Sequence, residues 1–448
     1  MPDDRDRLPL TASQTVVWLA QQADPENPIH AAAEYLDIQG PADLRLLQIA
    51  LRQAVEDTDA FRVRFEIDAD GPWQVVGQMR DWPLPVVDLR TALDPLPEAL
   101  AQMEADLRRT TDLTRDLPFN FTVFVLADDR SLLYVRAHHI VMDGFGFGLF
   151  LQRVAEVYTA LEQGQDCPPS GLGSLRELIE DDLRYRNSEQ FARDHEYWME
   201  QLSPLPAITT LAGKSAPTAH SFLRNSGQVP APVVDQLRDL ARRARCSLPT
   251  VAMAALALYL QRTTGAHDLV LELVVAGRKG PVARSVPGMV TNAPPLRIEM
   301  DPAMTTGELL RHTAARARGV MQHQRYPSCL LAHDLGIADA GIVTEPPAIN
   351  IMGYTPNLHF GQHPVKLHNL SNGAVEDLTI NVYDRSDGSL RIDFNANPSL
   401  YGAAENAEHH SNFMDLLHAF ATADPEEPVA GLGLQPSSAA TIFSCARA

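Results

Sequence analysis

The sequence is poor in features that mark several large classes of protein. Lysine and arginine number 37 against 57 aspartates and glutamates, the formal net charge is −20, and no basic run stands out. Nucleic acids and anionic membranes bind clustered positive charge, so neither is expected as a partner. The longest apolar run, "VAMAALALYL" at 251–260, has about half the length that spans a bilayer and predicts a buried helix.

Cysteine is also scarce, and its placement argues against a disulfide framework or a metal site. The four cysteines are far apart and share no metal-ligand spacing (Cys167, Cys246, Cys329 and Cys445). We expect them to be reduced, mostly buried thiols. The first residues, "MPDDRDRLPL", are acidic and lack the apolar core of a secretory signal. These features predict a cytoplasmic protein.

What the sequence does contain is an alternation of helical and strand patterns over 448 residues, a length sufficient for two lobes with cores of their own. Apolar spacing predicts helices at 44–57, 148–164, 174–202, 233–244, 249–263, 306–324 and 407–422. Alternating runs predict strands at 61–67, 73–76, 121–127, 131–137, 268–276, 293–300, 348–354, 378–384 and 390–396. We therefore predict an α/β (α+β) fold of two similar lobes with a ligand-binding cleft between them.

The stretch "RAHHIVMDGFGFG" at 136–148 concentrates chemistry at the end of a predicted strand. Side chains alternate between the faces of a strand, so His139 falls on the apolar face of Leu133, Val135 and Ala137. It should point inward, and His138 should point to the other face and join a hydrogen-bond network. A histidine at the rim of a water-poor cavity can act as a general base or a hydrogen-bond acceptor.

The residues after the histidines strengthen this interpretation. Asp143 and Gly144 predict a tight turn with a helix beginning just afterwards, whose backbone N–H groups could polarise a carbonyl near His139. A lone histidine on an apolar face is more often a satisfied core residue, but these neighbours favour a functional site. Adjacent strand histidines diverge, which disfavours a metal site. The run "GFGFG" lacks the register of a nucleotide loop, and no Gly-x-Ser-x-Gly elbow of a serine hydrolase is present.

The segment "HHIVMDG" resembles the HHxxxDG signature of the condensation domains of nonribosomal peptide synthetases, which belong to the chloramphenicol acetyltransferase-like superfamily. Further landmarks of that family follow in order along nearly the whole chain. They are "LPLTASQTVVWLAQQ" (with Ser13, Gln14 and Trp18), "DTDAFRVRF", "FARDHEYW", "VPGMVTNAPPLRI", "HQRYP" and "SNGAVEDLTINVYD". Together they make the resemblance specific.

The resemblance implies two acetyltransferase-like lobes in a V-shaped pseudo-dimer with a central tunnel. The N-terminal lobe would cover 1–173, and 174–448 would hold a linker helix and the C-terminal lobe. No cofactor would be bound, because a carrier protein would deliver the acyl donor on its 4'-phosphopantetheine arm. The acceptor would be a small molecule or a second carrier-bound substrate, and the protein would act as a monomer.

The resemblance also assigns roles to single residues. His139 matches the second histidine of the motif, which lies at the reaction centre, and Gly144 would lie beside the developing oxyanion. His138 and Asp143 would be structural. In this family the aspartate pairs with an arginine of the second lobe, and Arg278 in "VAGRKG" is the best positional match.

Departures from related families narrow the activity. Heterocyclisation relatives carry an aspartate pattern in place of the histidine pair, which disfavours cyclisation, and the second-lobe signature of epimerisation domains is not seen. After the last helix the sequence "GLGLQPSSAATIFSCARA" shows no adenylation or carrier segment, so we expect a free-standing condensation enzyme that makes an amide or ester of a secondary metabolite. The alternatives are an epimerisation-type relative and a non-catalytic member that only docks carrier proteins.

Overall fold

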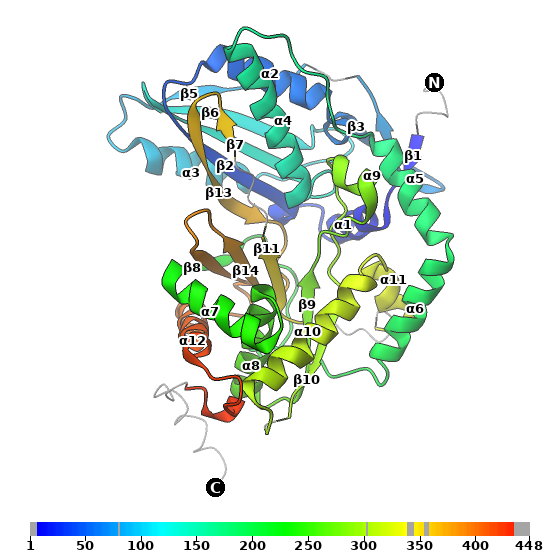
Figure 1. Ribbon diagram of the computed structural model, residues 1–448. Coiled ribbons are helices and arrows are strands. Elements are labelled where there is room, and N and C mark those ends of the chain that lie inside the picture. Colours follow the sequence, from blue (N-terminus) through cyan, green and yellow to red (C-terminus); the bar gives the residue numbers. More distant parts are fainter. Residues whose placement is uncertain (1–6, 79–80, 302, 338–344, 354–357, 434–448) are drawn as a thin grey trace. The chain divides into compact units, whose positions relative to one another are not determined.

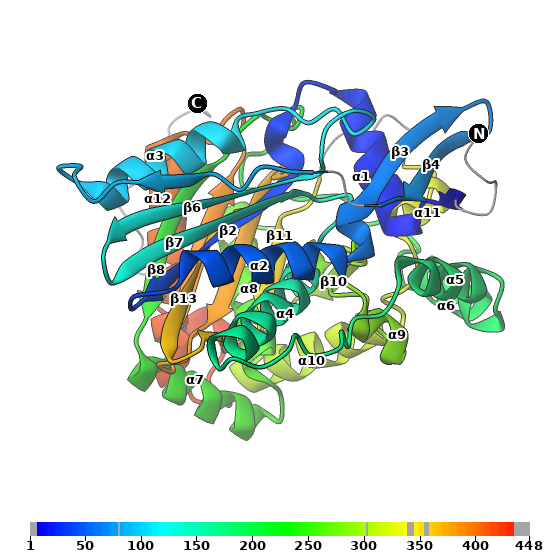
Figure 2. The same cartoon turned by 90° about the horizontal axis from the view of Figure 1, so that it is seen from above.

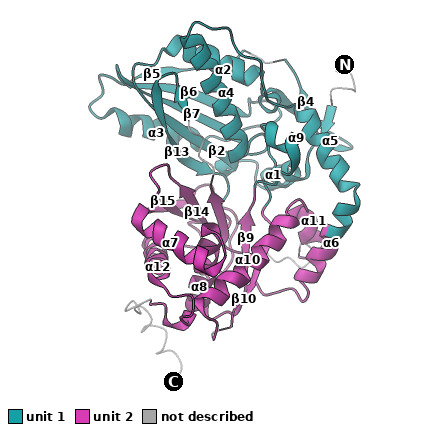
Figure 3. Cartoon of the chain, in the orientation of Figure 1, with its two compact units in different colours: residues 1–193, 276–292, 354–374 teal, residues 194–275, 293–353, 375–448 magenta. Residues whose placement is uncertain are grey.

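The structure is a computed structural model that describes residues 7–78, 81–301, 303–337, 345–353 and 358–433. The chain forms two compact units (Figure 3). Unit 1 contains residues 1–193, 276–292 and 354–374, and unit 2 contains 194–275, 293–353 and 375–448. Each unit is built around a six-stranded sheet. The division into lobes at residue 173 remains a prediction, because compact units group residues by contact.

The sheet of unit 1 combines strands from both halves of the sequence (Figure 1). Its order is β12 (His359–Phe360), β13 (His363–Asn372), β2 (Ala31–Gln39), β7 (Arg130–His138), β6 (Phe119–Ala127) and β5 (Val86–Asp88). Strand β2 is antiparallel to both β13 and β7. The pairing of β13 with β2 therefore brings residues around 370 into the same sheet as the HHIVMDG segment.

Helices cover both faces of this sheet (Figure 2). Helices α2 (Leu44–Glu56) and α4 (Gly144–Glu162) lie on one face, where Leu133, Val135 and Ala137 of β7 contribute to the core. Helix α3 (Pro95–Leu107) lies on the other face, over a smaller core that includes Leu132 and Tyr134. The alternation predicted for β7 is thus confirmed, and both of its faces are buried.

A three-stranded sheet and several helices complete unit 1. The small sheet has the order β1 (Arg7–Pro9), β4 (Gly71–Val76) and β3 (Val63–Asp68). Helix α1 (Ala12–Ala23) begins with a capping box between Thr11 and Gln14. Helices α5 (Leu175–Arg186) and α9 (Gly280–Ser285) also belong to this unit.

Unit 2 holds the second six-stranded sheet, which pairs strands in both directions. Its order is β10 (Pro295–Glu299), β9 (Asp268–Val274), β11 (Ala348–Met352), β14 (Leu378–Asp384), β15 (Leu390–Ala396) and β8 (Leu223–Val229), with β11 parallel to both neighbours. Its helices are α7 (Ala231–Ala244), α8 (Leu248–Thr264), α10 (Thr306–Gln322), α11 (Ser328–Asp334) and α12 (Ala403–Thr422). Helix α8 carries the run 251–260 and is buried along it, as predicted.

Most predicted elements are present, and three expectations are wrong. The helix expected over 174–202 is two helices, α5 and α6 (Glu189–Gln201), because the chain leaves the helix at Asn187. The helix expected from 148 begins at Gly144. None of the three described cysteines is fully buried: Cys167 is exposed, and Cys246 and Cys329 are half-buried. Cys445 and most of the C-terminal segment lie outside the described residues. In the part of the chain described, no helix has the length and apolarity needed to cross a membrane.

Candidate active site

The candidate site is the short connection between β7 and α4 in unit 1. Strand β7 ends at His138 and helix α4 begins at Gly144, so His139 and Asp143 lie in the intervening turn. Asp143 is the N-cap of α4, with extended backbone angles, and its side chain accepts a hydrogen bond from the Gly146 amide. An N-cap aspartate stabilises a helix start by satisfying one of its free N–H groups.

His138 is held in a buried hydrogen-bond network, as the sequence predicted. Its Nε2 lies 2.8 Å from the side-chain oxygen of Gln21, and its Nδ1 accepts the amide of Ile140 at 3.2 Å. The side-chain nitrogen of Gln21 donates its two hydrogens among the backbone carbonyls of residues 24, 25 and 27. These contacts require a neutral ring with the proton on Nε2. Burial favours the same neutral form, because it lowers the pKa of His138 well below its ordinary value.

His139 is anchored through its backbone while its ring is left less constrained. Its amide donates to the carbonyl of His30 at 2.7 Å, and its buried Nδ1 has no hydrogen-bond partner. Burial lowers the pKa of His139, although the charge of Asp143 and the nearby carbonyl oxygens of His139 itself and Asn372 oppose the shift. The ring is therefore a neutral base at neutral pH, with a nitrogen that is not committed to the protein.

Asp143 has every acceptor position of its carboxylate occupied. It receives the amides of Gly146 at 2.7 Å, Val290 at 2.9 Å and Thr291 at 3.1 Å, as well as the guanidinium of Arg278 at 2.8 Å. The residue is fully buried, and Arg278 with these amides holds its pKa below the ordinary value against the effect of burial. A carboxylate engaged in this way braces the turn and is not available as a proton acceptor.

Arg278 joins Asp143 to the segment around Gly288. Its Nη2 also donates to the carbonyl of Gly288 at 2.9 Å, and its Nη1 donates to the carbonyls of Ala283 and Val286. The guanidinium carbon lies 4.8 Å from the ring centre of Phe145. The predicted partnership of Asp143 and Arg278 is thus present as a buried ion pair, and the segment that carries Arg278 packs within unit 1.

The start of α4 leaves one glycine open and packs another tightly. Gly144 is exposed, and a Cβ added there would meet nothing within 4 Å. A Cβ on Gly146 would instead lie 2.9 Å from the backbone nitrogen of Gly288. Gly146 therefore allows α4 and the segment around Gly288 to approach each other, whereas Gly144 leaves open space at the positive end of the helix dipole.

Three neighbours of the histidines could not be recognised from the sequence. His30, the residue before β2, has its ring centre 6.2 Å from that of His138, and burial lowers its pKa to about 4. Asn372 and Gly373 lie beside His139 because β13 pairs with β2. The glycine turn was recognised in "SNGAVEDLTINVYD", but no local pattern connects residue 373 with residue 139.

Several of the landmark segments support the motif or one another. Within unit 1, Gln14 donates to the carbonyl of Ile140 at 3.1 Å, and Ser13 donates to the carbonyl of Val290 at 3.2 Å. Within unit 2, Asp194 of "FARDHEYW" contacts Nδ1 of His323 of "HQRYP" at 2.7 Å. Across the described ranges, no group of three histidine, cysteine, aspartate or glutamate side chains is arranged to hold a metal ion.

Comparisons with known proteins show which family the chain belongs to. Residues 4–441 match the model of the family described as "Condensation domain". The chain is 40% identical over 419 residues to a dimodular nonribosomal peptide synthase of Bacillus subtilis (strain 168). That alignment covers 93% of the chain and 18% of the relative. It is 38% identical over 417 residues to an isonitrile lipopeptide synthase of Streptomyces coeruleorubidus. That alignment covers 93% of the chain and 28% of the relative. The chain thus spans less than a third of either curated relative.

Solved structures of similar domains match over nearly the whole chain. A mutant starter condensation domain of rhizomide synthetase, in complex with C8-CoA and Leu-SNAC, superposes with a TM-score of 0.89 at 35% identity, covering 95% of this chain and 97% of that one. The first condensation domain of the calcium-dependent antibiotic synthetase, in complex with a substrate analogue, gives a TM-score of 0.89 at 30% identity, covering 96% and 99%. The chain belongs to the condensation domain family, whose members form amide bonds by acyl transfer in nonribosomal peptide biosynthesis.

Proposed function

We propose that this chain transfers an acyl group from the 4'-phosphopantetheine thioester of a carrier protein to an amine or alcohol acceptor, in the cytoplasm. The observation that carries the proposal is the state of His139. Its imidazole lies at the end of β7, is kept neutral by burial, and has a nitrogen without a partner in the protein. A scaffold that only docks carriers has no need of such a group.

In the proposed reaction the acceptor nitrogen or oxygen attacks the thioester carbonyl. A carbon–nitrogen or carbon–oxygen bond forms, the acceptor's proton is taken or oriented by His139, and the carbon–sulfur bond breaks. The proton then passes to the departing thiolate, so the pantetheine arm leaves as a free thiol. Positioning of the acceptor by the imidazole contributes alongside its strength as a base.

The other motif residues act by fixing this geometry. The ion pair of Asp143 and Arg278 holds the turn that follows His139, and His138 ties the end of β7 to Gln21. Gly144 is open at the start of α4, so a developing oxyanion near its N–H would be stabilised by the helix dipole. Each of these roles rests on contacts within unit 1.

The donor should arrive already activated. The sequence has no nucleotide loop to activate a free acid and no serine elbow to hold an acyl group, so the energy of the new bond must come from a thioester. Contact with a carrier protein supplies binding energy remote from the reacting carbon. Because the net charge of this chain is −20 and carriers are usually acidic, docking should be local, apolar and weakly dependent on salt.

The test compares one acyl group on its holo carrier, on free pantetheine and as the free acid, at two salt concentrations, with product measured by mass spectrometry. We expect turnover from the carrier to exceed turnover from pantetheine at both salt concentrations. Equal rates from carrier and pantetheine would remove the carrier requirement. Turnover of the free acid with ATP would refute the condensation reaction itself.

A further inference from the structure

Glu34 places a carboxyl group on a sheet face that is otherwise apolar. It lies on β2 between Ala32 and Leu36 on the face covered by α2 and α4, and the residues paired directly opposite it are Val135 on β7 and Asn369 on β13. The residue is half-buried. The other β2 residues on this face (Ala32, Leu36 and Ile38) are apolar and part of the core, so a carboxyl group departs from its surroundings, and departures of this kind concentrate at functional sites.

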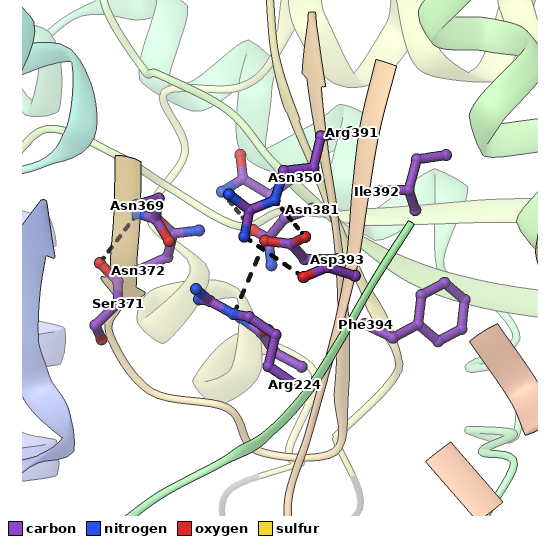
Figure 4. A network of polar contacts seen from close by, with 12 residues as sticks. Arg224, Asn350, Asn369, Ser371, Asn372, Asn381, Arg391, Ile392, Asp393 and Phe394 are labelled. Carbon is purple, nitrogen blue, oxygen red and sulfur yellow. Dashed lines mark hydrogen bonds and ion pairs between the residues drawn. The ribbon is translucent and has the colours of Figure 1, made fainter. Parts of the chain in front are cut away.

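A β-bulge supplies this carboxyl group with polar neighbours. The register of β13 shifts between Asn369 and Ser371, and Asn369 pairs with Glu34 while Asn372 pairs with Ala32. Residues directly opposite each other share a face, so the bulge turns Asn369 and Asn372 to the same side although they are three positions apart. The Asn369 side-chain amide donates to the Asn372 side-chain oxygen at 2.7 Å (Figure 4).

The polar group ends beside the imidazole of His139. The backbone carbonyl of Asn372 lies close enough to act on the pKa of His139, and Gly373 packs against the ring. Ser371 fixes the turn by donating to the carbonyl of Ala31 at 2.8 Å and accepting the amide of Gly373 at 3.2 Å. A continuous set of contacts thus runs from Glu34 through Asn369 and Asn372 to His139.

Glu34 carries a proton in a large share of molecules near neutral pH. Burial raises its pKa to about 7, and the hydrogen bond with Asn369 opposes the shift without cancelling it. No cation contributes to the pKa of this carboxyl group among the residues described. A protonated carboxyl group in an apolar wall can both donate and accept a hydrogen bond, which suits a neutral polar group and not an ion.

We propose that Glu34, Asn369 and Asn372 form a binding site for a hydroxyl or other neutral hydrogen-bonding substituent on the acyl donor, close to its thioester carbon. This inference rests on the proposed function of His139 and adds the class of donor. The nearest residues on the same face (Ala32, Leu36 and Val135) are apolar and belong to the buried core, so the polar cluster is the part of this face that offers hydrogen bonds to a substituent of the acyl group. An amine acceptor could arrive as an ammonium ion, which would select an ionised carboxylate instead.

The expected preference for a hydroxylated donor follows from the hydrogen bond that the plain alkanoyl donor cannot make with the cluster of Glu34, Asn369 and Asn372. A site built to hydrogen-bond a substrate hydroxyl discriminates strongly against the analogue that lacks it, whereas a purely apolar pocket discriminates by only ~10–200-fold per methylene group. We therefore expect kcat/KM for a hydroxylated donor to exceed that for the plain alkanoyl donor by at least tenfold.

The experiment measures kcat/KM for octanoyl, 2-hydroxyoctanoyl and 3-hydroxyoctanoyl groups on one holo carrier, with one acceptor. The variants are Glu34→Gln, which keeps a donor and an acceptor at this position, and Glu34→Leu, which removes both. Glu56→Gln is the control, since Glu56 is exposed at the end of α2. Glu34→Gln should keep most of the preference for a hydroxylated donor, and Glu34→Leu should lose it while turning over octanoyl at least as well as the wild type.

One further measurement separates the inference from the proposed reaction on which it rests. Direct binding of octanoyl-CoA and 3-hydroxyoctanoyl-CoA, measured by calorimetry, reports on the site even if nothing turns over. If no donor gave product but 3-hydroxyoctanoyl-CoA bound more tightly than octanoyl-CoA, the proposed reaction would be refuted and the binding site would be supported. Equal kcat/KM for the three acyl groups, together with equal binding of the two CoA thioesters, would refute the site.

Discussion

Gly373 lies against the imidazole of His139: a Cβ added to Gly373 would stand 2.6 Å from Cδ2 of the ring. This glycine also has φ of +89°, a conformation that side chains rarely adopt. The turn after β13 therefore sets where the imidazole can lie, and no larger residue fits without moving it.

Replacing Gly373 with alanine should displace the imidazole and lower kcat by at least tenfold. The backbone conformation itself should cost ~1–2 kcal/mol of stability. Gly388→Ala is the matched control, because Gly388 has φ of +81° and its added Cβ would make only an ordinary contact, 3.5 Å from Ala231. The prediction is supported if both variants lose a similar amount of melting temperature and only Gly373→Ala also loses kcat. Normal turnover by Gly373→Ala would show that the ring position is not critical.

The two histidines of the motif should respond in opposite ways to alanine. His139→Ala should lower kcat by ~10²–10⁴-fold, the usual value of general-base help, with little change in melting temperature because its Nδ1 makes no hydrogen bond. His138→Ala should lose ~1–3 kcal/mol of stability because it leaves the buried oxygen of Gln21 unpaired. Thermal unfolding and single-turnover kinetics on the same preparations give both readouts. An unfolded His139→Ala protein would make that residue part of the core.

Asp143→Ala should lose stability and activity together. The ion pair with Arg278 is buried, and removing one partner leaves an uncompensated charge at a cost of ~3–5 kcal/mol. The double variant Asp143→Ala/Arg278→Ala should lose less than the sum of the two single variants, because neither charge remains alone. Chemical denaturation measures the free energies of unfolding. A variant that lost activity but kept its full stability would place Asp143 in the chemistry.

The local part of this site could be predicted from the sequence, because it depends on residues that are close together in the chain. Alternation along 131–137 placed Leu133 and Val135 on one face of β7 and Tyr134 on the other. The spacing of Asp143 and Gly144 predicted a turn and a helix start, although the helix begins four residues before the expected position. These features depend on neighbours in sequence, which a periodic pattern records.

The long-range part could not be predicted from periodicity. Asp143 and Arg278 are 135 positions apart, and their pairing was expected only from the resemblance. Strand β2 has buried residues on both faces, so "AAAEYLDIQ" shows no clear alternation and Glu34 did not stand out. The pairing of β2 with β13 creates the surroundings of Glu34 and Gly373, and strand pairing across more than 300 residues leaves no local signal.

The pH dependence of the reaction should report the surroundings of His139. Burial lowers its pKa below the ordinary 6.5, so the neutral base persists to lower pH than an exposed histidine would allow. The acid limb of kcat/KM should therefore have its midpoint below pH 6.5, since protonation removes the base only at the lowered pKa. Burial raises the pKa of Glu34 to about 7, so the profile should be repeated with Glu34→Gln, in which the acid limb assigned to His139 should keep its midpoint. An acid limb at or above pH 6.5 in both proteins would mean that the imidazole is in contact with water, or that another group controls the rate.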